Sequence, residues 1–186
     1  APYLKLMEIS DEMCKRLLHH EGLYYPLGLG PHGLVSEALL LHMKSPAIHG
    51  ALNMIYRYGI TEDETYAQKV YPYLRGVADF WEKDLVCRDG VYHVVGDGMH
   101  ERTDGNIRDN GVPEDPVNTL GYLKTFFTWM PRISEALDLD EKKREKWLEI
   151  AENLAPYPKG TIREIQENPT LWKEVDVKLE DLLPQE

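Results

Sequence analysis

The feature that most constrains this fold is a series of amphipathic helical segments joined by very short turns. Apolar residues recur in these segments at about the 3.6-residue period of an α-helix with one buried face. The segments are residues 3–20, 46–58, 61–86, 117–130 and 139–154. Two of the connections, GIT at 59–61 and DLD at 138–140, are so short that the helices they join must be antiparallel neighbours. We therefore predict an all-α fold built from antiparallel helical hairpins.

Several residues mark the expected helix ends. Ser45 followed by Pro46 is typical of a helix start, with serine as the cap and proline in the first turn. Gly59 is expected to end that helix. Thr61, with Glu64 three residues later, has the spacing of a capping box and predicts the start of the next helix.

Other features predict irregularities and a surface ion pair. Pro72 and Pro131 interrupt the periodic pattern and are expected to kink their helices. Residues 34–43 are expected to form a short helix after a glycine-rich loop. Asp140 and Arg144 have the i, i+4 spacing of an ion pair on an exposed helix face.

Residues 87–114 form a long stretch without helical periodicity. Arg88-Asp89-Gly90 is a turn signal, and the β-branched and aromatic run VYHVV follows it, so a short β-hairpin is expected there. Four glycines then interrupt a polar loop. A loop of this length within a helical chain is typically functional or disordered.

Composition excludes several classes of protein. The 186-residue chain has 21 Lys and Arg against 32 Asp and Glu, a formal charge of −11. We therefore expect no nucleic-acid partner, because such binding depends on cationic side chains that displace counterions. An acidic chain is also a poor ligand for an anionic membrane surface, and no apolar run approaches the length of a membrane span. Cys14 and Cys87 are too few for a disulfide framework.

The 87–114 loop is rich in groups that carry acid–base chemistry. Hydrolysis of a glycosidic bond needs a carboxylic acid that stays protonated near neutral pH and a second group that activates water. Apolar neighbours in the loop favour the protonated form of a carboxyl by desolvation, and Glu101, which follows the predicted hairpin, is our candidate for the acid. The alternative is an acidic loop that is simply solvated. His93 and His100 match no compact metal-ligand pattern, so we expect neither a metal nor another cofactor.

Four residues are candidates for substrate binding. His49 and Asn53 are four residues apart and share one face of the 46–58 helix, where they can hydrogen-bond hydroxyl groups. The alternative for His49 is a buried position with its hydrogen bonds satisfied. The other two candidates, His100 and Asp115, belong to the loop and its C-terminal edge.

Three stretches of the chain resemble a known family. They are YLKLMEISDEMCKRLLHHEGLYYPLGLGPHG at 3–33, HGALNMIYRYGITEDETYAQKVYPYLRGVADFWEKDLV at 49–86 and DPVNTLGYLKTFFTWMPRISEALDLDEKKREKWLEIAENLAPYP at 115–158. The second resembles a hallmark helix pair of bacterial six-hairpin glycosidases, and the third is similar to the next pair. The group most similar in these motifs is family 95 of the glycoside hydrolases, which contains α-L-fucosidases and α-L-galactosidases. The resemblance covers roughly residues 3–160.

The resemblance implies an (α/α)6 toroid and an inverting mechanism. In the family, a Glu general acid lies in the loop after the hairpin, and this position falls on Glu101. The family frame around that residue is rich in Ser and Pro, whereas this chain has GDGMHERTDG. His49 lies about where the group often has a Trp that lines the sugar site. The water-activating residues of the family lie outside these 186 residues.

The predicted helices are too few to close a ring of six hairpins. We therefore expect residues 1–160 to be a partial (α/α)6 glycosidase-like catalytic domain and residues 161–186 to be a C-terminal tail or the start of the next hairpin. The expected protein is a fragment of an enzyme that hydrolyses fucosyl or galactosyl oligosaccharides or polysaccharides, inactive in isolation. Its expected partners are the carbohydrate and either the remainder of the parent chain or further copies of itself.

A second reading makes the chain a non-catalytic helical module that binds carbohydrate or protein. The altered frame around Glu101 and the missing base favour this alternative. The sequence does not determine the compartment, and a periplasmic or extracellular parent protein is compatible with the resemblance.

Overall fold

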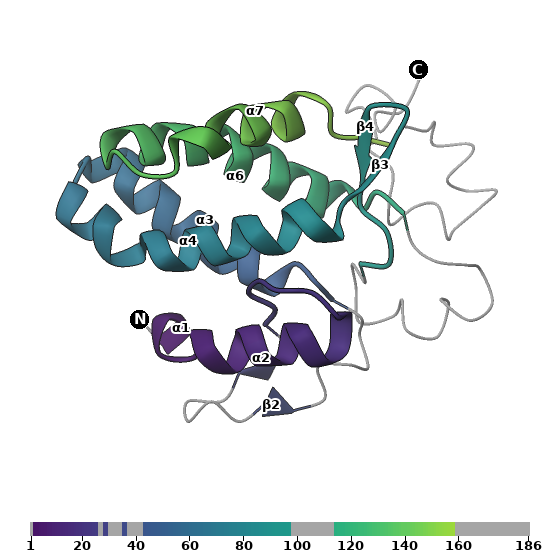
Figure 1. The fold of residues 1–186 in the computed structure, drawn as a ribbon, viewed down its shortest axis with the longest axis horizontal. Coiled ribbons are helices and arrows are strands. Elements are labelled where there is room, and N and C mark those ends of the chain that lie inside the picture. Colours follow the sequence, from purple (N-terminus) through teal and green to yellow (C-terminus); the bar gives the residue numbers. More distant parts are fainter. Residues whose placement is uncertain (1, 26–27, 30–34, 37–42, 98–113, 159–186) are drawn as a thin grey trace, which may run out of the picture.

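The computed structural model describes residues 2–25, 28–29, 35–36, 43–97 and 114–158, and this part of the chain is mostly helical (Figure 1). The helices are α1 (Pro2–Lys5), α2 (Met7–Leu18), α3 (Pro46–Thr61), α4 (Glu64–Asp84), α6 (Val117–Ala136) and α7 (Arg144–Glu152), the last preceded by the 3₁₀ turn η2 (Glu141–Lys143). Two antiparallel strand pairs are described, β1 (Gly28–Leu29) with β2 (Val35–Ser36) and β3 (Val86–Arg88) with β4 (Val91–His93). The prediction of a helical chain with a short β-hairpin after the second long helix is confirmed.

Helices α4 and α7 lie side by side and run in the same direction. Near the start of α4, the Tyr71 hydroxyl donates to Asp140, which precedes η2, over 2.9 Å. Near the end of α4, Glu82 accepts hydrogen bonds from Lys143 at 2.7 Å and from the Trp147 indole at 2.8 Å. Since contacts advance along both segments together, the two helices are parallel.

Helices α3 and α6 form a second parallel pair. His49 in the first turn of α3 stacks on Tyr122 of α6, and Gly59 near the end of α3 faces Trp129 of α6. The α6–α7 hairpin therefore packs beside the α3–α4 hairpin, and the two hairpins have the same orientation. The first helix of each begins at the end where β3 and β4 lie (Figure 1). An up-and-down four-helix bundle differs, because adjacent helices in it are antiparallel.

The core lies between these helices and extends to α2. Its largest fully buried side chains include Phe80 and Trp81 of α4, Phe126 of α6 and Trp147 of α7. The segment after α2 packs on α4, where the Leu23 amide donates to the Gly76 carbonyl over 3.0 Å. No helix in the described ranges is both long and apolar enough to cross a membrane.

The ends of the central helices differ from the prediction. Gly59 lies inside α3, which continues to Thr61 and ends at Glu62 with a left-handed φ of 50°. A Cβ at Gly59 would lie 2.8 Å from the Trp129 ring, so glycine here permits close helix packing. Asp63 caps α4 by accepting the Tyr66 amide at 3.0 Å, and Thr61 is not the cap.

Three further expectations are wrong. The segment 3–20 forms two helices interrupted at Leu6, and Val35–Ser36 is a strand where the 34–43 helix was expected. Residues 37–42 lie outside the described residues. Asp140 does not pair with Arg144, because a left-handed φ of 47° places Asp140 before η2, where it accepts hydrogen bonds from Tyr71 and Arg75.

The two predicted proline kinks do not interrupt the helices. Pro72 lies within the uninterrupted α4 and Pro131 within the uninterrupted α6. Buried residues on both sides of each proline hold the helix in place, and tertiary packing supplies most helical stability in proteins.

Gly22 provides a test of the contact between α4 and the segment after α2. Its φ is +128°, and an added Cβ would lie 2.5–2.7 Å from Phe80. Gly22→Ala should lower the free energy of unfolding by about 3–5 kcal/mol, combining backbone strain with overpacking. The control is Gly90→Ala, where φ is +83° and no atom lies within 4 Å. Strain alone should cost the control about 1 kcal/mol. If urea denaturation showed the same decrease in the free energy of unfolding for both variants, the packing argument would be contradicted.

Candidate functional site

One side of α3 is exposed along its whole length. His49, Asn53, Tyr56 and Ile60 follow one another at helical spacing, and all four are exposed, Tyr56 by 51% and Ile60 by 83%. The Asn53 amide donates to the His49 carbonyl over 3.4 Å, so its side chain stays on the helix surface. His49 and Asn53 share one face, as predicted, and the buried alternative for His49 is wrong.

Aromatic rings of α6 border the same side. The rings of His49 and Tyr122 are stacked, with centroids 5.7 Å apart and planes at 26°. Trp129 lies seven residues after Tyr122, hence on the same side of α6, and is half-buried against Gly59. We call this surface the α3–α6 free face and define it by His49, Asn53, Tyr56, Ile60, Tyr122 and Trp129. It combines aromatic rings with hydrogen-bonding groups, and the Arg132 guanidinium lies over the Trp129 ring, 5.3 Å from its centroid.

A buried carboxylate joins the N-terminal ends of α3 and α6. Asp97 is 0% exposed. One carboxylate oxygen accepts the backbone amide of Lys44, just before α3, and the other accepts the hydroxyl of Thr119, in the first turn of α6, each over 2.6 Å. Asp97 therefore links the two helix starts directly.

The charge of Lys44 is already paired beside Asp97. Its ammonium donates to both oxygens of Asp84 at 2.9 Å and to the Val95 carbonyl at 2.9 Å. Burial raises the pKa of Asp97 to about 6, and the hydrogen bonds from Thr119 and Lys44 offset only part of this effect. A carboxyl with this pKa exchanges its proton in the physiological range, but it does so inside the protein.

Asp115 ties β4 to the start of α6. One of its oxygens accepts the Val94 amide at 2.8 Å, and the other contacts Nδ1 of His93 at 2.7 Å. Its own amide donates to the Val94 carbonyl at 2.8 Å, and its φ is 51°. Asp115 was predicted to bind substrate, but both of its carboxylate oxygens already have partners within the chain. Asp115 therefore links β4 to the segment before α6, and its role in substrate binding stays a prediction.

The structure does not place every predicted site residue. Glu101 and His100 lie outside the described residues, in the stretch 98–113. The described residues on either side of this stretch are held near the N-terminal ends of α3 and α6, through Asp97 on one side and through the pairing of Val95 with Glu114 on the other.

Sequence reasoning missed the aromatic half of the free face. The seven-residue spacing of Tyr122 and Trp129 was a usable signal, although it equally describes core residues. The links of Asp97 gave no signal, because Lys44 lies 53 positions earlier in the chain.

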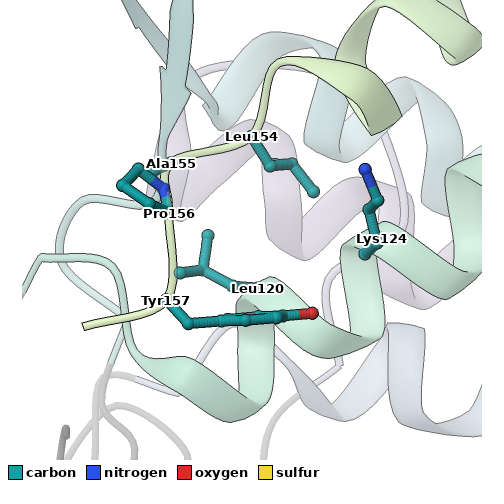
Figure 2. A pocket seen from close by; sticks show the side chains of 6 residues that line it. All are labelled: Leu120, Lys124, Leu154, Ala155, Pro156 and Tyr157. Atoms are coloured by element: carbon teal, nitrogen blue, oxygen red, sulfur yellow. The ribbon is translucent and has the colours of Figure 1, made fainter. Parts of the chain in front are cut away.

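The described residues offer neither a metal site nor, in the hollow beside α6, a second polar site. Within the described ranges, no group of three or more His, Cys, Asp or Glu residues is arranged to hold a metal ion. A hollow of about 180 Å³ lies between α6 and the segment after α7, and Figure 2 shows its lining residues. It is largely apolar, and its one charged group, the Lys124 ammonium, donates to the Ala151 carbonyl.

Comparison with known proteins adds no assignment. No protein-family model matches the chain, and no match is found among the curated proteins.

Asp97 provides a test of the buried link. Asp97→Asn retains both hydrogen bonds, with the amide oxygen accepting from Lys44 and the amide nitrogen donating to Thr119. Because the pKa of Asp97 is raised on folding, its stabilising contribution is complete below pH about 4 and is lost as the pH rises through about 6. The stability of the wild type relative to Asp97→Asn should therefore fall by about 2–3 kcal/mol over this pH range and then level off. Chemical denaturation of both proteins at several pH values measures this difference, and a constant or rising difference would contradict the assignment.

Proposed function

We propose that the chain is part of a carbohydrate-active hydrolase in which the α3–α6 free face binds a saccharide. The observation that carries this proposal is the composition of that face, where aromatic rings and hydrogen-bonding side chains lie together along α3 and α6. Sugar rings present apolar C–H faces that pack on aromatic rings, and their hydroxyl groups bond to imidazole and amide groups.

The stacking of the hairpins supports an (α/α)6 toroid as the complete architecture. In a toroid, each hairpin contributes one helix to a parallel inner layer and one to a parallel outer layer. The pairs α3 with α6 and α4 with α7 have these two relationships. The free face would then line the centre of the ring, and the remaining hairpins would come from other parts of a longer protein or from further copies of this chain.

The proposed reaction is inverting hydrolysis of a fucosyl or galactosyl bond, with Glu101 as the general acid. The residues that define the free face include no carboxylate, so the proton donor has to come from another segment. The 98–113 stretch is suited to this role, because the residues on either side of it are held at the helix starts next to His49. Asp97 itself is too deeply buried to reach a substrate.

The alternative proposal is a non-catalytic module that binds carbohydrate through the same face. The sequence GDGMHERTDG around Glu101, which departs from the Ser- and Pro-rich frame of the resembled family, favours this alternative. The two proposals share the binding surface and differ only in whether a bond is cleaved, so separate experiments address them.

Binding to the free face is tested by calorimetry with neutral oligosaccharides that end in fucosyl or galactosyl units. Tyr122→Ala should weaken binding about tenfold, because the ring that packs on the sugar is lost. Tyr157→Ala removes a 41% exposed tyrosine at the Figure 2 hollow and should leave affinity unchanged. Equal losses in the two variants, or loss only in Tyr157→Ala, would exclude the free face as the binding surface.

Hydrolysis is tested in the complete enzyme that this proposal requires. Glu101→Gln should reduce turnover of fucosyl or galactosyl substrates at least about a hundredfold, because amide cannot act as the general acid. Asn53→Ala should instead raise KM more than it lowers kcat. Unchanged turnover in Glu101→Gln would remove this residue from the mechanism. Binding without turnover in the unmodified protein would favour the non-catalytic module.

A further inference from the structure

The buried link at Asp97 joins the segment just before α3 to the first turn of α6, the two helices that carry the stacked pair. Lys44, whose amide Asp97 accepts, lies two residues before α3 and five residues before His49, and Thr119 is three residues before Tyr122 within α6. The turn from Thr119 to Tyr122 is rigid, because each helical residue rises only about 1.5 Å and is held by backbone hydrogen bonds. At α3, the His49 amide donates to the Ser45 carbonyl over 3.0 Å, which ties the segment at Lys44 to the first turn. The relative position of Lys44 and Thr119 is therefore passed to His49 and Tyr122.

The surroundings of Asp97 leave it little freedom to move. Its two 2.6 Å hydrogen bonds use both oxygens, and the side chain is fully buried. Lys44 is held a second time, since its ammonium bridges Asp84 at the end of α4 and the carbonyl of Val95. Three segments that are distant in sequence thus converge on one carboxyl group.

We propose that Asp97 is a positioning residue that sets the spacing between His49 and Tyr122 on the α3–α6 free face. The carboxyl acts on saccharide binding through these two side chains and does not touch the ligand. The link to saccharide binding rests on the proposed function, whereas the effect on ring geometry does not depend on it.

Ring geometry is measured first, by the NMR shifts of the His49 imidazole protons at one fixed pH. A proton above an aromatic ring resonates upfield, and Tyr122→Leu defines the shift expected when this effect is lost. Asp97→Ala and Thr119→Val should move the His49 resonances toward the Tyr122→Leu values. Asp97→Asn, which keeps both hydrogen bonds, should retain the wild-type shifts.

A matched control separates positioning from general loss of stability. Glu82→Gln removes the charge of another part-buried carboxylate and weakens its hydrogen bonds from Lys143 and Trp147 between α4 and α7. It should leave the His49 shifts unchanged. If Asp97→Ala does not fold, Thr119→Val, which removes only one of the two donors, decides the question. Wild-type shifts in Thr119→Val, or an equal change in Glu82→Gln, would overturn the proposal.

Saccharide binding is measured second, with the fucosyl and galactosyl oligosaccharides used above. Asp97→Ala or Thr119→Val should weaken binding about tenfold, and Asp97→Asn should restore affinity to within about twofold of the wild type. If the wild type binds no saccharide while the His49 shifts follow Asp97, the proposed function fails and the positioning role stands. If saccharide binds with unchanged affinity in Thr119→Val, the proposed role of Asp97 in binding is overturned.

Discussion

The arrangement of the helix starts depends on one buried carboxyl group. Burying Asp97 is costly, because a carboxylate loses its hydration, and two short hydrogen bonds offset part of that cost. Both donors lie at helix starts, so the compensation exists only while α3 and α6 begin side by side. The hydrogen bonds of one side chain thus favour the observed placement of the two hairpins, since a slip of either helix would leave a buried acceptor without a partner.

The two hairpins pack side by side in the same orientation, and this arrangement brings the side chains of the free face together. Because α3 and α6 are parallel neighbours, residues at equal depth in the two helices meet, as His49 and Tyr122 do at one end and Gly59 and Trp129 at the other. The partner helices α4 and α7 provide much of the buried aromatic core on the other side. A polar and aromatic surface is therefore exposed along α3 and α6, while the core lies against their other sides.

Local patterns in the sequence predicted the elements better than their arrangement. Periodicity identified the long helices, and Asp89-Gly90 identified the hairpin turn, where both residues have positive φ. The placement of His49 and Asn53 on one face also followed from spacing alone. Tertiary contacts decided the rest: Gly59 reads as a helix stop but is required by the Trp129 ring, and Asp140 reads as a partner of Arg144 but bonds to Tyr71. The pairing of Asp97 with Lys44 spans 53 positions and has no local signature.

The parallel direction of α3 and α6 has an electrostatic consequence. Each helix carries a partial positive charge at its N-terminus and a partial negative charge at its C-terminus. The N-termini of α3 and α6 share one end with the C-termini of α4 and α7, so the four helix dipoles oppose one another there. A negative group at this end is therefore stabilised only where it meets backbone amides at the start of α3 or α6, as the carboxylate of Asp97 does at the Lys44 amide.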